Sequence, residues 1–287
     1  MKPLMIGLIF LATIGQAQHL DIQGHRGARG LLPENTLPAF QKALELGVDT
    51  LELDLAVTKD GVLVISHDPH VNPEICTGPA GAEVAADLAI HSLTQAELAQ
   101  YDCGAKANPK FEGQVAVPGT HIPTLAEVLE LGQGNSVRFN IETKITPEWE
   151  QAGLTPAPME FARLAVEQVQ KAGLIDRVTL QSFDFRTLTA AHELAPELEL
   201  AALSDDPEFI AAAPGNLGDL PVQVFSPFFG LLDSDRVKEI QAAGYKVIPW
   251  TINNPEDIRE VLAWGVDGII SDYPDRAIEI AQELKLR

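Results

Sequence analysis

The chain has 287 residues, of which 41 are Asp or Glu and 20 are Lys or Arg, so its formal net charge at pH 7 is −21. Nucleic acids and anionic lipid surfaces bind proteins through cationic side chains, and this charge argues against either as the main partner. No Gly/Ser linker or low-complexity tract divides the sequence, so we expect one domain.

The first 17 residues have the pattern of a secretory signal peptide. Lys2 precedes an apolar run from about Leu4 to Ile14, and small residues follow at Gly15 and Ala17. The run is much shorter than the ~20 residues that a transmembrane helix needs. No cysteine lies near the expected cut, so a lipid anchor is not expected either. We therefore predict removal of residues 1–17 and an exported, periplasmic or secreted chain of residues 18–287 without a stable membrane anchor.

From residue 19 onward, short apolar or β-branched runs alternate with amphipathic helical runs. Asn35 or Thr36 is expected to cap the first helix, and Gly47 to end it. Repeated βα units imply parallel strands with right-handed crossovers, and eight such units close into a barrel. The sequence therefore predicts an α/β fold, a (β/α)8 TIM barrel. The eight expected strands are 19–24, 50–57, 138–144, 177–182, 198–203, 222–227, 246–252 and 267–272.

Residues 68–123 interrupt this rhythm with many turn residues and both cysteines. We expect them to form an insertion after the second strand, beside the barrel mouth, and residues 60–68 to begin it as a short hairpin strand. Cys76 and Cys103 are expected to form a disulfide, because the chain is predicted to leave the reducing cytoplasm. Two free structural thiols are the alternative.

The second predicted strand carries two carboxylates, Glu52 and Asp54, among leucines. Successive side chains of a strand point to opposite faces, so the two acids share one face and the leucines take the other. In a barrel the acidic face looks inward, where a bare charge is too costly unless it is paired or binds a metal. A solvent-facing amphipathic strand is the alternative interpretation.

Polar side chains recur where the other predicted strands end, which is where barrel enzymes carry their active sites. This recurrence favours a functional site over a solvent-facing strand. Trp250 is interpreted either as a contact for substrate carbons or as a core aromatic at the mouth. The candidates are His25 and Arg26 after the first strand, Asn140, Glu142 and Lys144 on the third, Gln181 on the fourth, Trp250 on the seventh and Asp272 on the eighth.

The residue types indicate metal and phosphate chemistry. Glu52, Asp54 and Glu142 supply oxygen ligands without a neighbouring cysteine, which suits Ca²⁺ or Mg²⁺. Arg26 and Lys144 place positive charge beside the expected ion, as an anionic ligand requires in so acidic a protein. A phosphate ester is the natural candidate.

Two histidines flank the acidic cluster. His25 follows the first strand and His67 follows the hairpin, and an unperturbed imidazole pKa of ~6.5 permits proton transfer near neutral pH. The remaining histidines lack such a context and are expected to be packed or surface residues: His19, His70, His91, His121 and His192.

Together the motifs resemble the glycerophosphodiester phosphodiesterase family from about Asp21 to Pro274: GHRGARGLLPENT, ELDLAVTKDGVLVISHDP, IPTLAEVL, NIETK, QSF, PWTIN and DGIISDYP. The resemblance implies a (β/α)8 barrel that uses Ca²⁺ or Mg²⁺ to cleave glycerophosphodiesters to sn-glycerol 3-phosphate and an alcohol. It further implies the following roles: His25 and His67 as the acid/base pair, Glu52, Asp54 and Glu142 as metal ligands, and Arg26 and Lys144 near the phosphate. We also expect Gln181 and Trp250 to contact this small-molecule substrate.

Three rival functions share some of these features. A lysophospholipase D-like phosphodiesterase would need an exposed apolar surface near the mouth, which only residues 68–123 are expected to supply. A glycoside hydrolase would not need Arg26 or Lys144. A catalytically silent metal- or phosphate-binding protein would not need both histidines. The sequence leaves open the alcohol, the attacking group, the roles of the individual histidines and the oligomeric state.

Overall fold

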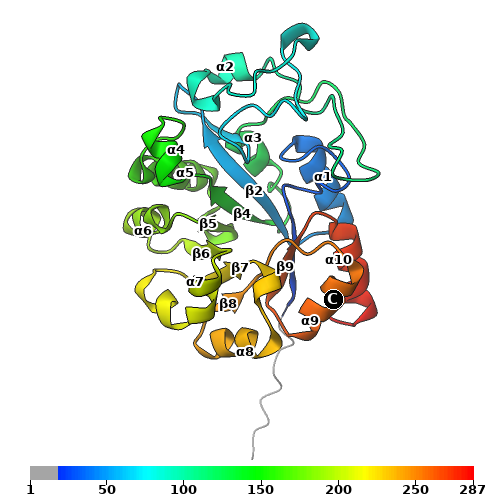
Figure 1. Cartoon of the computed structure of the whole chain (residues 1–287), viewed down its shortest axis with the longest axis vertical. Coiled ribbons are helices and arrows are strands. Elements are labelled where there is room, and N and C mark those ends of the chain that lie inside the picture. The colour runs from blue at the N-terminus through cyan, green and yellow to red at the C-terminus, as the bar shows by residue number, and fades with distance from the viewer. Residues whose placement is uncertain (1–18) are drawn as a thin grey trace, which may run out of the picture.

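The computed structural model describes residues 19–287, so the predicted signal peptide lies outside the described residues. Figure 1 shows strands at the centre with helices around them. Eight parallel strands follow one another in the order β8-β7-β6-β5-β4-β2-β1-β9, which confirms the predicted barrel. They are β1 (Asp21–Gly24), β2 (Thr50–Val57), β4 (Arg138–Thr143), β5 (Val178–Ser182), β6 (Glu199–Ser204), β7 (Val224–Pro227), β8 (Lys246–Val247) and β9 (Gly268–Ser271).

The barrel is nearly closed between β8 and β9. The sequence predicts a strand over 246–252, but β8 ends at Val247. Pro249 follows closely and has no N–H to donate, so a regular ladder does not continue through it. Single backbone bonds join the two edges instead: Asp267 N–H donates to Val247 O and Ile270 N–H to Pro249 O, each at 3.0 Å.

The outer helices begin and end where the local chemistry favours it. Thr36, rather than Asn35, caps α1 (Leu37–Leu46) by accepting a hydrogen bond from Ala39 N–H, and Gly47 ends this helix at φ 89°. Among the described residues, none of the helices has both the length and the apolar character of a bilayer span. The other helices around the barrel are α3 (Leu125–Glu130), α4 (Pro147–Gln151), α5 (Pro158–Ala172), α6 (Phe185–Leu194), α7 (Pro207–Ala212), α8 (Ser234–Ala242), α9 (Pro255–Ala263) and α10 (Pro274–Glu283).

The two faces of β2 have opposite surroundings, as the alternation predicts. Leu51, Leu53 and Leu55 are fully buried in the main core between the sheet and the helices. Glu52 and Asp54 point to the other side, into the barrel, and each is only 1% exposed. Burial of the leucines therefore holds the strand so that its two acids face inward.

Residues 68–123 form a separate small layer beyond the end of β2 (Figure 1). It is entered through β3 (Leu63–Ile65), which pairs antiparallel with β2 and confirms the predicted hairpin strand. The layer contains only short helices, among them α2 (Gln95–Leu98). It has its own apolar core, formed by Val71, Ile75, Cys76, Val84, Ile90, Leu98, Cys103 and Ile122, with Ala56 and Val64 from the adjoining strands.

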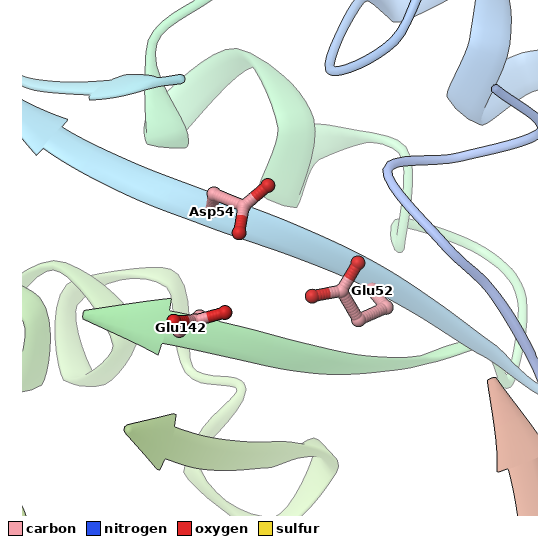
Figure 2. Close-up of side chains that lie close together, drawn as sticks. All are labelled: Glu52, Asp54 and Glu142. Atoms are coloured by element: carbon pink, nitrogen blue, oxygen red, sulfur yellow. The ribbon is translucent and has the colours of Figure 1, made fainter. Parts of the chain in front are cut away.

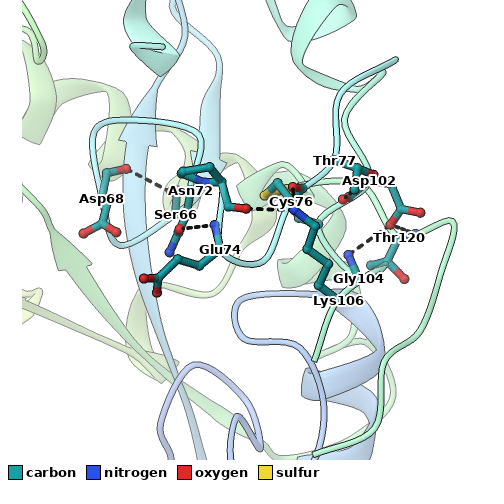
Figure 3. The surroundings of a disulfide bond; sticks show 12 residues. Ser66, Asp68, Asn72, Glu74, Cys76, Thr77, Asp102, Gly104, Lys106 and Thr120 are labelled. Atoms are coloured by element: carbon teal, nitrogen blue, oxygen red, sulfur yellow. Dashed lines mark hydrogen bonds between the residues drawn. A yellow bond between two sulfur atoms is a disulfide. The ribbon is translucent and has the colours of Figure 1, made fainter. Parts of the chain in front are cut away.

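Cys76 and Cys103 form a disulfide bond, which confirms that prediction. Figure 3 shows the bond among residues from both halves of the insertion. Next to it, Thr77 and Asp102 exchange two backbone hydrogen bonds, at 2.8 and 2.9 Å. The carboxylate of Asp102 also accepts bonds from three backbone N–H groups farther along the chain. The disulfide therefore joins the first half of the insertion to the second.

Replacing Cys76 and Cys103 by alanine is expected to lower the free energy of unfolding by about 3 to 4 kcal/mol, because the bond restricts the unfolded chain. Urea unfolding at fixed pH measures the change. Reductant should shift the unmodified protein toward the variant and leave the variant unaffected. Equal unfolding midpoints for the oxidised protein and the variant would contradict this expectation.

Candidate active site

Three carboxylates meet at the carboxyl end of the barrel strands. In the parallel pairing of β2 with β4, Asp54 lies opposite Glu142 and Glu52 lies opposite Asn140. One oxygen from each of Glu52, Asp54 and Glu142 lies within 4.8 Å of the others. Figure 2 shows the three carboxyl groups gathered between the two neighbouring strands. The strand register thus brings together acids that are far apart in the sequence.

Burial and mutual repulsion disfavour the charged forms of two of these acids. Burial raises the pKa of Glu52, and the charges of Asp54 and Glu142 raise it further. Burial also raises the pKa of Glu142; Lys144 opposes this effect and Asp54 adds to it. Burial acts on Asp54 too, but neighbouring cations, Arg26 first, outweigh it and lower the pKa of Asp54. Full ionisation of all three acids would therefore leave buried negative charge that Arg26 and Lys144 balance only in part.

A divalent cation fits this cluster. Oδ1 of Asp54 is buried and has no hydrogen-bond donor. This oxygen lies beside two acids whose pKa values are raised, and a bound cation would relieve the negative charge of the ionised cluster. The available ligands are all carboxylate oxygens, which is typical of Ca²⁺ and Mg²⁺ sites. Glu52, Asp54 and Glu142 are thus the residues with which the chain can hold a metal ion.

Glu52 is oriented by one hydrogen bond to each of its carboxylate oxygens. Nε2 of Gln181 donates to Oε1 and the backbone N–H of Arg26 donates to Oε2, both at 2.9 Å. Gln181 in turn accepts a bond from Nδ2 of Asn140 at 2.9 Å. Gln181 also lines a cavity that borders Glu52 and Glu142, as expected of a substrate contact. Its carboxamide, however, is engaged by Glu52 and Asn140, so its visible role is to hold Glu52.

Two cations stand beside the acids, as the sequence predicts. Nζ of Lys144 lies 2.9 Å from Oε1 of Glu142 and 4.0 Å from Oδ1 of Asp54. Nε of Arg26 lies 3.2 Å from Oδ2 of Asp54, and its Nη1 donates to Glu34 at 2.7 Å. Glu34 was not recognised from the sequence, and its only signal was its place in the motif that carries Arg26.

His25 and His67 line one cavity of about 310 Å³ next to the acids. Nδ1 of His25 lies 2.6 Å from Oδ1 of Asp272, and Nε2 lies 3.9 Å from Oε2 of Glu52. Burial lowers the pKa of His25 to about 4, although Asp272 acts in the opposite direction. The ring of His25 is therefore neutral near pH 7. His67 follows β3, its Nδ1 lies 2.9 Å from Oδ1 of Asp68, and its side chain is 32% exposed.

Trp250 and Phe183 form an aromatic wall of the same cavity. Their ring centroids are 5.5 Å apart in an edge-to-face arrangement. Nε1 of Trp250 donates to the carbonyl of Ser226 at 2.8 Å, and Nζ of Lys144 lies 5.5 Å from the Phe183 ring centroid. Trp250 is thus anchored on one side and faces the cavity on the other, where it can support the carbon atoms of a ligand.

Further polar residues near the site had no role in the site assigned from the sequence, although Asn35 was a candidate helix cap. Nδ2 of Asn35 donates to Oδ2 of Asp54 at 2.8 Å. Nε of Arg29 lies 2.7 Å from Oδ1 of Asp272, and Nδ2 of Asn253 donates to Oδ2 of Asp272 at 2.6 Å. The sequence identified Asp272 only as a polar strand end. Arg29, Asn35 and Asn253 lie within quoted motifs but give no local signal of their partners.

Comparisons with known proteins identify the family. The sequence profile of the glycerophosphoryl diester phosphodiesterase family matches residues 25–276. A glycerophosphodiester phosphodiesterase from Bacillus altitudinis is 34% identical over 269 residues, which cover 92% of this chain and 99% of that protein. The chain is also similar to the crystal structure of a protein from Silicibacter pomeroyi that is described as a glycerophosphoryl diester phosphodiesterase. The TM-score is 0.84 at 30% identity, and the match covers 94% of this chain and 95% of that one.

A second solved structure shares the fold at lower identity. It is an Oleispira antarctica phosphodiesterase in complex with the product sn-glycerol-3-phosphate. Its TM-score is 0.75 at 26% identity, and the match covers 91% of this chain and 96% of that one. On the family profile and the full-length similarity, the chain belongs to the glycerophosphoryl diester phosphodiesterase family.

Proposed function

We propose that the chain hydrolyses glycerophosphodiesters to sn-glycerol 3-phosphate and an alcohol. One observation carries this proposal: a single cavity is lined by two imidazoles, three cations (Arg26, Arg29 and Lys144) and members of a three-carboxylate cluster. The cations and carboxylates can bind a phosphodiester. The imidazoles can take a proton from the attacking hydroxyl group and give one to the leaving alcohol oxygen. The product bound to the Oleispira antarctica phosphodiesterase supports the same product here.

Glu52, Asp54 and Glu142 are the proposed ligands of a Ca²⁺ or Mg²⁺ ion. When bound, such an ion polarises a phosphoryl oxygen and offsets its negative charge. Arg26 and Lys144 add fixed positive charge at the same cavity, where they attract the phosphate and stabilise charge that develops on its oxygens. In a chain with a net charge of −21, this local reversal of sign is needed to admit an anionic substrate.

His25 is the proposed general base and His67 the proposed general acid. His25 is buried and neutral, so one ring nitrogen is free to accept the proton of the attacking hydroxyl group. That hydroxyl belongs either to water, which gives sn-glycerol 3-phosphate directly, or to the neighbouring glycerol carbon of the substrate, which gives a cyclic phosphate that water must then open. A substrate without this glycerol hydroxyl can react only by the first route. His67 lies closer to solvent and protonates the alcohol oxygen as its bond to phosphorus breaks.

We further propose that residues 18–287 act as one exported domain. The disulfide supports this proposal, because such bonds form and persist outside the reducing cytoplasm. N-terminal sequencing of the protein recovered from the periplasm or medium should begin at residue 18. Recovery of the full chain from the cytoplasm alone, with an intact N-terminus, would contradict export.

The exposed apolar surface that the lysophospholipase D-like alternative needs lies mainly outside the insertion. Within the insertion, the large apolar side chain with high exposure is Val115, at 61%. The exposed apolar side chains nearer the cavity, Phe183 and Phe228, follow β5 and β7, so the expectation that only residues 68–123 supply such a surface was wrong. A comparison of glycerophosphocholine with lysophosphatidylcholine as substrates should favour the former.

His25→Ala and His67→Ala are each expected to reduce turnover of glycerophosphocholine by roughly 10²- to 10⁴-fold, because each removes one proton transfer. Release of glycerol 3-phosphate is the measurement. EDTA should abolish release, and Ca²⁺ or Mg²⁺ should restore it. His192→Ala, exposed on α6, is the matched control and should keep full turnover. Full turnover in either active-site variant would rule out this acid/base assignment.

Glu142→Gln should abolish metal binding without destabilising the metal-free protein. The glutamine keeps Oε1 as an acceptor for Lys144 and removes a charge that repels Asp54. The pKa of Glu142 is raised above its ordinary value of 4.5, so the folded state holds this proton more tightly than the unfolded state does. Ionisation of Glu142 therefore destabilises the protein as pH rises above that value, and the variant avoids this loss.

Urea unfolding in EDTA and with divalent cation tests this expectation. In EDTA at pH 7 the variant should be at least as stable as the unmodified protein. A cation at 100 times its Kd should stabilise the unmodified protein by about 2.7 kcal/mol and the variant very little. Glu197→Gln, at an exposed position, is the control and should behave like the unmodified protein. A variant that keeps the full cation effect would exclude Glu142 as a ligand.

A further inference from the structure

We propose that Asp272 is a positioning residue that fixes the tautomer and orientation of His25, a role that rests on the proposed function. Asp272 follows β9 and is 1% exposed. Its Oδ1 lies 2.6 Å from Nδ1 of His25. A charged carboxylate only accepts hydrogen bonds, so Nδ1 of His25 must carry the hydrogen. In the neutral ring this leaves Nε2 as the bare nitrogen, free to accept a proton.

Backbone hydrogen bonds hold both partners of this contact in place. The first and last strands of the barrel, β1 and β9, are neighbours. His25 N–H donates to the carbonyl of Ser271, and Gly30 N–H donates to the carbonyl of Asp272, both at 2.9 Å. A Cβ at Gly30 would meet a ring carbon of Tyr273 at 2.5 Å, so only glycine permits this close approach. The geometry therefore does not depend on side chains alone.

The carboxylate of Asp272 is itself held by two more side chains. Asn253 donates to its Oδ2 at 2.6 Å and accepts from its backbone N–H at 2.9 Å. Arg29 approaches both oxygens, with Nε 2.7 Å from Oδ1 and Nη2 3.4 Å from Oδ2. Burial alone would raise the pKa of Asp272, but His25, Arg29 and Asn253 lower it below its usual range. Asp272 thus stays charged and keeps accepting the hydrogen of His25.

The insertion covers this cluster from outside. The ring centroid of Phe111 lies 4.9 Å from Cζ of Arg29 and 6.3 Å from the ring of Tyr273. The side chain of Gln114 donates to the backbone carbonyl of Arg29. Phe111 covers part of the Arg29 guanidinium. Fewer water molecules around this group strengthen the ion pair of Arg29 with Asp272. The insertion therefore supports His25 although it is far from that residue in the sequence.

The arrangement predicts a loss of rate rather than of substrate affinity when Asp272 is removed. Nε2 of His25 lies on the cavity side, 3.9 Å from Oε2 of Glu52. Without the acid at Nδ1, the ring can adopt the other tautomer, in which Nε2 carries hydrogen and accepts no proton. Arg26 and Lys144 keep their places, so binding of the phosphodiester is retained.

Asp272→Asn in the full chain is expected to lower kcat for glycerophosphocholine by about 10²-fold or more with little change in KM. The matched control is Asp21→Asn. Asp21 opens β1 at the opposite end of the barrel and bonds to Gln23 and Thr50, so this change should leave kcat and KM unaltered. An unchanged kcat in Asp272→Asn, or a loss that appears only in KM, would overturn the positioning role.

A measurement on the unmodified protein tests the same proposal without a variant that could fail to fold. ¹⁵N NMR of labelled histidine should show the Nδ1–H tautomer for His25 near pH 7, and the Nε2–H tautomer would overturn the proposal. The two proposals fail separately. The expected tautomer without any release of glycerol 3-phosphate rejects the hydrolase function and leaves the contact intact. Release of glycerol 3-phosphate with the other tautomer rejects only the role of Asp272.

Discussion

Burying Glu52, Asp54 and Glu142 within 4.8 Å of one another opposes folding, because each carboxylate loses its hydration and repels its neighbours. The surrounding structure tolerates this arrangement by placing Arg26 and Lys144 on one side. Hydrogen bonds from Gln181 and from the backbone of Arg26 fix Glu52, which makes no close ion pair with either cation. Functional sites commonly keep arrangements that lower the free energy of unfolding because the reaction or the ligand requires them. A destabilising cluster whose members are each held by specific contacts has this character.

The barrel and its insertion contribute different parts of this site. Parallel pairing of β2 with β4 sets the acids side by side, and the leucines on the opposite face of β2 keep them turned inward. The two histidines enter from separate segments, His25 at the end of β1 and His67 at the base of the insertion. The disulfide-bonded insertion contacts His67 through Asp68. It reaches His25 through Phe111, Arg29 and Asp272 in turn. A change in the insertion would therefore alter the surroundings of both histidines without any change in the barrel.

The features that the sequence predicted are those that local patterns encode. Alternation of polar and apolar residues with a period of two predicts that Glu52 and Asp54 face the same side of their strand. The succession of strands and helices predicts the barrel. Contacts between distant segments have no such pattern. Nothing local indicates that Gln181 is used to hold Glu52, or that Asp272 at the end of the last strand meets His25 at the end of the first. The export signal lies outside the described residues and stays a prediction.

The metal site is tested most directly by a crystal structure of the protein soaked in Mn²⁺, with data recorded at the manganese absorption edge. We predict one anomalous peak bounded by the carboxylate oxygens of Glu52, Asp54 and Glu142, with Arg26 and Lys144 at its edge. A protein that hydrolyses glycerophosphocholine with Mn²⁺ but shows no peak among these three acids, or shows its peak at other residues, would contradict the site described above.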